Sequence, residues 1–244
     1  MTELSCAFSP FTLPYDGEHL SGVYGDGGTR ATAVVLHGAG TGSKDRLLPL
    51  LGEFTARGCR AIAFDFSGHG QSTGALRELS LRRRFEQAVA VIDARTPAPG
   101  PLVLVGFSMS GQTVADLVRH YGDRVAAIAL CAPAVYAAGA WDLPFGDGGG
   151  AFSTLIRTPG SWRAAPALDV LRAYGGHAVL AVPGTDAVIP PGVTAALATA
   201  LSTKARFTRL QLPDADHALG MWLRDHEEDR RRLVDAVLAG VPGR

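Results

Sequence analysis

Three residues that can together activate a serine for attack on a carbonyl carbon occur in the order Ser108, Asp186, His217. Ser108 stands in Gly-Phe-Ser-Met-Ser, where an apolar run ends and a helical pattern begins. A serine on a sharp strand-to-helix turn holds its hydroxyl above the sheet edge, and its neighbours two positions away must be small. Gly106 and Ser110 meet this requirement. Serine is also a common helix N-cap, so the motif indicates catalysis only together with a base and an acid.

Candidates for the base and the acid follow later in the chain. A serine hydroxyl needs a base, and the base needs a carboxylate that orients it. Asp186 and His217 each follow an apolar run, so both are expected at the same edge of the sheet as Ser108. Asp214 and Asp216 are the alternatives to Asp186. A carboxylate so close in sequence to His217 rarely reaches the far side of the imidazole, and we therefore assign the acid to Asp186.

The negative charge that forms on the substrate oxygen needs two hydrogen-bond donors. One is expected to be the N–H of Met109, the residue after the nucleophile. The other is expected to be the N–H of Ala39, in the loop after the first buried strand. Gly38 and Gly40 flank Ala39 and allow the backbone to approach a substrate.

Aromatic side chains indicate where a substrate group would sit. His37 begins the loop that contains Ala39, and Tyr136, Trp141 and Phe145 lie in an irregular stretch. We expect these four residues to line the substrate pocket, because apolar and aromatic side chains dominate such pockets. Their number favours a wall around an apolar or aromatic acyl group.

The other histidines and one aspartate have structural interpretations. His37 is expected to bond the backbone in a tight turn, and His69 to stabilise a turn or the pocket rim. His177 starts a strand and His226 lies on a charged helix, so neither is assigned to catalysis. Asp65 is expected to brace its turn, because the elbow position carries a serine rather than an aspartate.

The apolar pattern predicts a doubly wound α/β fold. Unalternating runs are typical of parallel strands buried on both faces, whereas the last run alternates as an edge strand does. The sheet is mostly parallel, has about eight strands, and is flanked by helices. The predicted strands cover 7–15, 19–24, 32–38, 59–66, 101–107, 125–133, 177–184 and 205–213. The predicted helices cover 45–57, 79–95, 109–121, 191–201 and 224–238.

Two segments carry more specific expectations. In the helix at 79–95, an apolar stripe faces the core, and Arg82, Arg83 and Arg84 turn mostly outward. Residues 134–165 interrupt the alternation of strands and helices and are too long for a simple connection. We interpret them as a small cap-like excursion within a single domain covering 1–244.

Composition limits the partners of this protein. Lys+Arg and Asp+Glu both number 23, so no basic stripe for nucleic acid is expected. Cys6, Cys59 and Cys131 show neither disulfide nor metal spacing, and the latter two read as buried thiols. There is no signal-peptide pattern and no apolar run of about 18 residues. We expect a cytoplasmic monomer or homodimer that acts on a small molecule, with no membrane partner, metal or cofactor.

Five blocks in order resemble the α/β-hydrolase superfamily: VVLHGAGTGSKDR, AFDFSGHGQSTG, LVGFSMSGQ, PGTDAVIPP and DADHALG. The chain is most similar to compact esterases of the cinnamoyl and feruloyl type and of the serine-aminopeptidase-like type. It departs from the family pattern at two places. Ser110 stands where a glycine is usual, and only Thr185 separates Gly184 from Asp186, where two residues are usual.

These residues together predict a serine hydrolase that cleaves a carboxylic ester of a small or aromatic acyl group. A thioesterase or acyltransferase would use the same three residues, because the leaving group lies outside the elbow. A non-hydrolytic binding protein or a lyase on the same scaffold is a further alternative, since a fold alone does not define function. A peptidase is another, although no acidic cluster is evident that would hold a free amino terminus.

Overall fold

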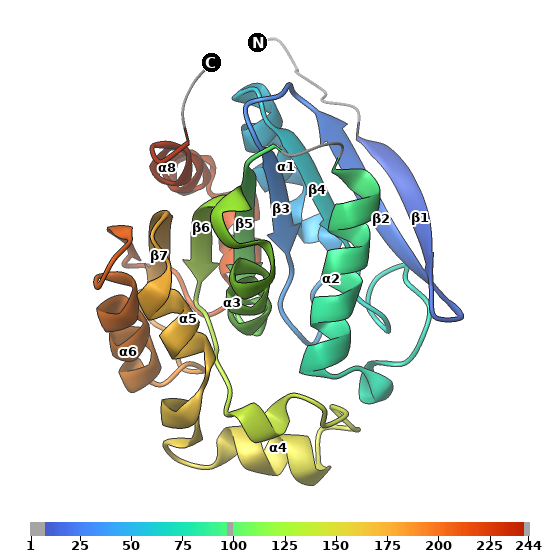
Figure 1. Cartoon of the computed structure of the whole chain (residues 1–244), viewed down its shortest axis with the longest axis vertical. Helices are drawn as coiled ribbons and strands as arrows, with labels where there is room; N and C mark the ends of the chain where they lie inside the picture. The colour runs from blue at the N-terminus through green and yellow to red at the C-terminus, as the bar shows by residue number, and fades with distance from the viewer. Residues whose placement is uncertain (1–7, 97–99, 242–244) are drawn as a thin grey trace.

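A computed structural model describes residues 8–96 and 100–241. Eight strands form one sheet in the order β1-β2-β4-β3-β5-β6-β7-β8 (Figure 1). The strands are β1 (Ser9–Tyr15), β2 (Glu18–Asp26), β3 (Thr32–Leu36), β4 (Arg60–Phe64), β5 (Leu102–Phe107), β6 (Val125–Cys131), β7 (His177–Pro183) and β8 (Arg206–Leu212). The predicted fold class, a mostly parallel sheet of about eight strands, is confirmed. Each strand lies within about two residues of its predicted bounds.

Only β2 runs in the opposite direction to the other seven strands. β1 pairs with β2 and β2 with β4 in antiparallel register, and the remaining pairs are parallel. The turn between β1 and β2 contains Asp16 and Gly17, both with positive φ, as a tight two-residue hairpin turn requires. The parallel strands β3, β5 and β7 are buried along their whole length. The edge strand β8 is partly exposed, in agreement with its alternating pattern.

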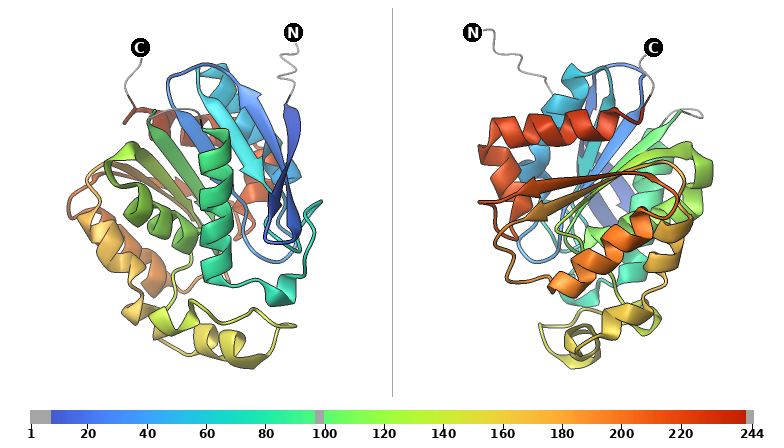
Figure 2. Two further views of the ribbon diagram at one scale, coloured as in Figure 1. Left: turned by 45° about the vertical axis from the view of Figure 1, so that its right-hand side comes forward. Right: turned by 90° about the vertical axis from the view of Figure 1, so that its left-hand side faces the viewer.

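Helices cover both faces of the sheet. α2, α3, α5 and α6 pack on one face, whereas α1, α7 and α8 pack on the other. Figure 2 shows α6 and α8 on opposite sides of the sheet in its right-hand view. The helices are α1 (Leu48–Ala56), α2 (Leu81–Arg95), α3 (Ser110–Tyr121), α4 (Gly150–Arg157), α5 (Ala167–Ala173), α6 (Pro191–Leu201), α7 (Leu219–Asp225) and α8 (Glu227–Leu238).

Two predicted helices differ from the observed ones. The first turn of the helix expected at 45–57 is a 3₁₀ turn over Lys44–Leu47, and α1 follows it. The helix expected at 224–238 is two helices that meet at His226, which is extended. The N–H of His226 donates to the carbonyl oxygen of Trp222 at 2.8 Å and ends α7 there. α7 begins at Leu219, earlier than predicted and two residues after His217.

The side chain of Arg84 corrects a sequence prediction. Arg82 is exposed and Arg83 is partly exposed, as expected, but Arg84 is fully buried. Its guanidinium group lies over the ring of Phe66, and the guanidinium carbon Cζ is 3.7 Å from the ring centroid. Its Nη2 atom donates to the carbonyl oxygen of His37 and to the hydroxyl oxygen of Ser110, whereas its Nε and Nη1 atoms have no hydrogen-bond partner among the described residues. The helical pattern of apolar residues does not reveal such a buried polar environment.

The segment between β6 and β7 contains more helix than its sequence suggests. It includes α4, α5 and the 3₁₀ turns Ala138–Ala140 and Ser161–Ala164. α4 lies beyond the end of the sheet toward which β3 and β6 point (Figure 1). The chain here crosses the edge where Ser108 emerges. The description of this segment as a cap within one domain stays a prediction.

Cys59 and Cys131 are buried free thiols, as predicted, and Cys6 lies outside the described residues. In the described part of the chain, no helix combines the length and apolar character that a membrane crossing requires.

Candidate active site

Ser108 occupies a strained turn between β5 and α3. Its φ is +50°, an unusual value for a residue with a side chain. The turn is held by backbone hydrogen bonds, in which Ser108 N–H donates to Cys131 O and Gly111 N–H donates to Ser108 O, both at 2.9 Å. A Cβ atom on Gly106 would lie 2.5 Å from the carbonyl oxygen of Ser110, so only glycine fits there. This is the geometry that exposes a nucleophile at the end of a strand.

His217 and Asp186 extend from Ser108 as a chain of hydrogen bonds. The Oγ atom of Ser108 lies 3.0 Å from Nε2 of His217, and Nδ1 of His217 lies 3.0 Å from Oδ2 of Asp186. Because Asp186 accepts the proton on Nδ1, Nε2 is left to accept the hydroxyl proton of Ser108. The structure thus brings together the three residues that the sequence separates by up to 109 positions.

Close contact between two loops places Asp186 beside His217. A Cβ atom on Gly184 would lie 1.8 Å from the carbonyl oxygen of Pro213, so glycine lets the loop after β7 touch the loop after β8. Gly184 N–H donates to Leu212 O at 2.8 Å, and Thr185 N–H donates to Ala215 O at 3.1 Å. These contacts bring the carboxylate to the imidazole despite the shortened spacing after Gly184.

Asp186 is held as a carboxylate. Burial raises its pKa, but hydrogen bonds from His217 and from the amides of Ile189 and Val188 hold the pKa below the usual carboxyl value. Val188 N–H and Ile189 N–H donate to Oδ1 of Asp186 at 2.8 and 2.9 Å, which leaves Oδ2 for the imidazole. Asp216, one of the two alternatives, instead accepts a hydrogen bond from the amide of Ala218 at 2.9 Å.

The two proposed oxyanion donors, Met109 and Ala39, belong to the elbow and to the loop after β3. Met109 precedes the first residue of α3, and Ala39 lines the same cavity as Ser108. Within the described residues, neither amide nitrogen donates a hydrogen bond to another protein group. Both N–H groups are thus free to bind a substrate oxygen.

A buried network joins the loop of Ala39 to the elbow, and sequence reasoning missed it. The Nη2 atom of Arg84 donates to the carbonyl oxygen of His37 and to Oγ of Ser110, both at 2.8 Å. Ser110 Oγ donates in turn to the same His37 oxygen at 2.6 Å. Burial lowers the pKa of Arg84 to about 9, which leaves the guanidinium group charged at neutral pH. The serine that replaces the usual glycine therefore has a partner. Ser110 in the elbow was the sequence signal that could have pointed to a polar partner.

Ser108 and His217 share a small cavity of about 230 Å³. One wall comes from the loop after β3 and from the turn before α1, and the other from the start of α7. His37 contributes to the lining, as predicted from the sequence. The remaining lining residues are Gly38, Ala39, Thr41, Gly42, Ser43, Arg46, Leu47, Phe107, Ala218, Leu219, Gly220 and Met221.

The three aromatic residues that we expected in the substrate pocket lie elsewhere. Tyr136 and Trp141 line a separate cavity of about 260 Å³ next to α3. Phe145 is buried against Phe152, with ring centroids 4.5 Å apart. These rings pack within the segment between β6 and β7 and against α2, where Trp141 contacts Phe85 with ring centroids 5.8 Å apart. Burying their large apolar surfaces stabilises that segment.

The remaining histidines and Asp65 have structural contacts. Phe66 N–H donates to Nε2 of His37 at 3.2 Å, and Nδ1 of His37 lies 2.6 Å from Gly38 O. Burial lowers the pKa of His37 well below the usual value, so its ring is neutral. His69 packs against His37, with ring centroids 4.8 Å apart. Asp65 forms a buried ion pair with Lys44 at 2.7 Å and braces the turn after β4.

His177 and His226 lie outside the cavity. Nε2 of His177 contacts the carbonyl oxygen of Ala236 at 2.8 Å, and the ring of His226 stacks on Trp222. In residues 8–96 and 100–241, no group of three His, Cys, Asp or Glu side chains is placed to hold a metal ion.

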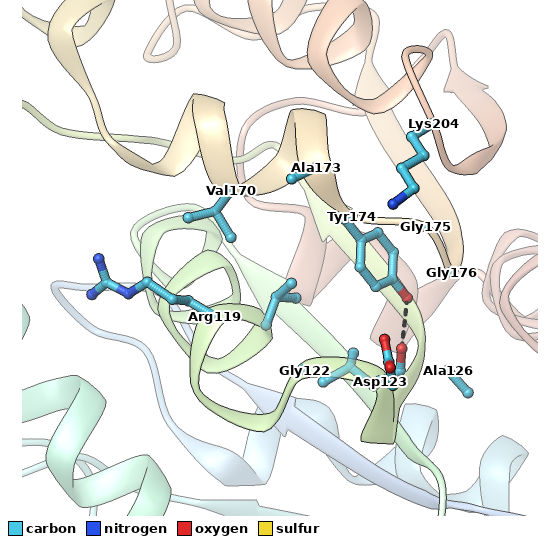
Figure 3. Close-up of a pocket in the computed structure, with 12 residues that line it drawn as sticks. Arg119, Gly122, Asp123, Ala126, Val170, Ala173, Tyr174, Gly175, Gly176 and Lys204 are labelled. Carbon is cyan, nitrogen blue, oxygen red and sulfur yellow. Dashed lines mark hydrogen bonds between the residues drawn. The ribbon is translucent and has the colours of Figure 1, made fainter.

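A larger cavity, of about 540 Å³, lies at the opposite edge of the sheet, near the start of β6 and β7. Figure 3 shows Arg119 and Lys204 at opposite sides of it, with the Tyr174 ring between them. The Tyr174 hydroxyl donates to the carbonyl oxygen of Val125 at 3.1 Å. None of the predicted site residues lines this cavity, so its size does not identify it as the catalytic site.

The sheet order and the strand-to-helix elbow define an α/β-hydrolase. A family model described as "Serine aminopeptidase, S33" matches residues 27–155, which is more than half of the chain. The chain therefore belongs to this family of α/β-hydrolases. The matched residues include Ser108 and the loop of Ala39 but end before Asp186 and His217.

Curated relatives match over limited lengths. A pyrethroid hydrolase of Sphingobium wenxiniae is 33% identical over 97 residues, which are 39% of this chain and 33% of that protein. A multifunctional-autoprocessing repeats-in-toxin of Vibrio vulnificus is 25% identical over 131 residues, which are 48% of this chain and 2% of the toxin. The matched part thus spans about a third of the first relative and a small fraction of the second.

Solved structures share the fold at low identity. A thioesterase domain from the curacin biosynthetic pathway is 14% identical with a TM-score of 0.73, covering 94% of this chain and 99% of that one. An esterase of Pyrococcus furiosus is 16% identical with a TM-score of 0.72, covering 99% and 94%. Est1E from Butyrivibrio proteoclasticus, bound to ferulic acid, is 14% identical with a TM-score of 0.69, covering 94% and 99%. At these identities the likeness shows the fold alone.

Proposed function

We propose that this hydrolase cleaves small carboxylic esters through an acyl-enzyme formed on Ser108. The hydrogen-bonded chain from Ser108 through His217 to Asp186 is the observation that supports the proposal. His217 takes the proton of Ser108 as its oxygen attacks the ester carbonyl, and Asp186 stabilises the imidazolium that forms. The alcohol leaves with that proton. A water molecule, deprotonated by His217, then releases the acid.

The amides of Met109 and Ala39 bind the oxyanion in this scheme. A donor of this kind is typically worth about 10²–10³ in rate. The size of the cavity, about 230 Å³, favours a short substrate over a long acyl chain. A thioester would meet the same groups.

Aminopeptidase activity, which the family name suggests, has less support from the cavity. A substrate with a free amino terminus needs a carboxylate near the serine, and among the described residues none lines the cavity around Ser108. Arg46, the permanently charged residue among those that line it in the described chain, is positive and would repel an ammonium group.

Labelling with a fluorophosphonate, read by intact mass, tests the proposed function. We expect one adduct per chain in the wild type and none in Ser108→Ala or His217→Ala. Asp186→Asn should label at a much lower rate, because the imidazole loses its orienting carboxylate. Asp214→Asn is the matched control and should label as the wild type does. Absence of an adduct in folded wild-type protein would contradict the proposal and favour a non-hydrolytic role.

A panel of short acetate and butyrate esters, the matching thioesters and amino-acid p-nitroanilides then identifies the leaving group. We expect turnover of the esters. Exclusive turnover of the p-nitroanilides would instead identify a peptidase.

A further inference from the structure

The cavity beside Ser108 has an uneven distribution of charge. Apart from His37 and His217, most of its walls are formed by small, hydroxyl-bearing and apolar residues such as Thr41, Leu47 and Met221. Among the described residues that line it, Arg46 alone carries a permanent charge, and no carboxylate faces it there. A substrate held against Ser108 therefore shares a small space with an unneutralised guanidinium group.

Arg46 has no partner of its own within the described chain: it forms neither an ion pair nor a hydrogen bond there. Most other arginines are engaged, as Arg57 is with Asp235 and Arg83 with Asp16. Arg157 also forms no such contact, but it is exposed at the end of α4 and does not line this cavity. Arg46 is thus the unpaired arginine at the catalytic serine.

The charge of Arg46 acts on the catalytic loop. The pKa of His37 is lowered mainly by burial, and the charges of Arg84 and Arg46 lower it further. His37 lies two residues before the proposed donor Ala39. The positive potential of Arg46 therefore extends to the place where a substrate would bind, and in a partly desolvated cavity such a potential is felt strongly.

We propose that Arg46 binds a carboxylate carried by the substrate, so that the preferred esters are short and negatively charged. This inference rests on the proposed ester hydrolysis at Ser108. A guanidinium group suits a carboxylate because it offers two parallel N–H donors to its two oxygens. The walls of Leu47 and Met221 would accommodate the methylene groups between the carboxylate and the ester.

Acidic residues near the cavity could instead favour a positively charged substrate. Asp214, Asp216 and Asp225 line a neighbouring shallow pocket, which shares Ala218 and Met221 with the serine cavity. A cationic substrate group would be attracted to those aspartates. Binding at Arg46 predicts a preference for anionic esters, whereas binding at the aspartates predicts a preference for cationic esters. One set of substrates distinguishes the two.

Three methyl esters of similar length test the proposal: monomethyl adipate, methyl hexanoate and methyl 6-aminohexanoate, with hydrolysis followed by titration of released acid. We expect kcat/KM of the wild type to be at least about tenfold higher for the adipate ester than for the hexanoate ester, as one charge-assisted hydrogen bond provides. The aminohexanoate ester should be the poorest. The preference should shrink at high salt, because Arg46 is partly exposed.

Variants assign the preference to Arg46. In Arg46→Gln the adipate-to-hexanoate ratio should fall to about one, and in Arg46→Lys most of it should return. Arg157→Gln removes an unpaired arginine elsewhere and should leave the ratio as in the wild type. A second pair, 4-acetoxybutanoate against pentyl acetate, shows whether the carboxylate belongs to the acyl or the alcohol half.

Two other outcomes separate this inference from the proposed function. Turnover of the neutral ester with no preference for either anionic one, or a preference for the cationic ester, would overturn the role of Arg46 and leave ester hydrolysis intact. Absence of both turnover and fluorophosphonate labelling would overturn ester hydrolysis and, with it, the role of Arg46.

Discussion

Ser110 occupies an elbow position that is usually glycine, and its hydroxyl group is hydrogen-bonded in the protein interior. Its hydroxyl links Arg84 on α2 to the carbonyl oxygen of His37, and all three groups are buried. A buried guanidinium group without a carboxylate is costly unless its hydrogens find acceptors. The hydroxyl supplies one acceptor, and the neighbouring peptide oxygen supplies another. Serine in the elbow is therefore coupled to arginine in α2.

We expect Ser110→Ala to lower the free energy of unfolding by about 1–3 kcal/mol, because Arg84 loses a buried acceptor. Urea unfolding measures this change. Ser153→Ala is the control: Ser153 is also a buried helical serine, but its hydroxyl makes no hydrogen bond within the described chain, so a change within about 0.5 kcal/mol is expected. Equal losses in both variants would refute the coupling. The loss should also largely disappear when Ser110→Ala is made in an Arg84→Met background.

The loops after β7 and β8 form the part of the site that depends most on backbone contact. They carry Asp186 and His217, and they touch at Gly184 and Pro213, where no side chain fits between them. The distance of 3.0 Å between the carboxylate and the imidazole thus depends on a glycine two residues before Asp186. A displacement of about 1 Å at such a site costs about 10²-fold in rate.

Gly184→Ala should therefore slow fluorophosphonate labelling by about 10²-fold and destabilise the protein by about 1–3 kcal/mol through overpacking. Gly52→Ala is the matched control in α1, where an added Cβ meets no atom within 4 Å. It should stabilise the protein by about 0.5–1 kcal/mol and leave labelling unchanged. Unaltered labelling in Gly184→Ala would show that the loop contact does not position the carboxylate.

The folded chain as a whole also retains a buried acid away from Ser108. Asp116 on α3 is 4% exposed, accepts a hydrogen bond from Gln112 at 3.0 Å, and lies 3.5 Å from Arg119. Burial raises the pKa of Asp116 to about 6. The folded state therefore binds this proton more tightly than the unfolded state does, so the contribution of Asp116 to stability falls as pH rises from about 4 to 6.

Asp116→Asn should consequently raise the free energy of unfolding at pH 8, by at most about 3 kcal/mol for a shift of about two pKa units. The gain should vanish at about pH 3 and below, where the wild-type carboxyl is largely protonated in both states. Unfolding in urea at several pH values measures it. Asp169→Asn, which removes a charge from the exposed surface of α5, should show no such pH dependence. A gain that does not vary with pH would rule out titration of Asp116 as its cause.

Local sequence determined much of this protein. Continuous apolar runs can be buried only between two layers of helices, so β3, β5 and β7 were predictable as parallel strands. The carboxyl ends of such strands share one edge. For that reason Ser108, Asp186 and His217 were predicted to meet, and the structure places them in hydrogen-bond contact. Small residues on both sides of Ser108 likewise indicated the elbow from local sterics alone.

Tertiary packing decided what surrounds those residues. Helical periodicity indicates which positions face apolar surroundings, but it carries no information on buried oxygen atoms that could accept hydrogen bonds. The side chain of Arg84 was therefore predicted to face solvent, whereas in the structure it is buried. Aromatic residues between β6 and β7 pack against one another and against α2 instead of lining the cavity beside Ser108, because packing and not composition directs them. Arg46 lines the cavity beside Ser108 because the turn before α1 meets the elbow there in the folded chain. Reaction chemistry thus follows from residues near strand ends, whereas the charge and shape of the cavity arise from segments that meet only in the folded chain.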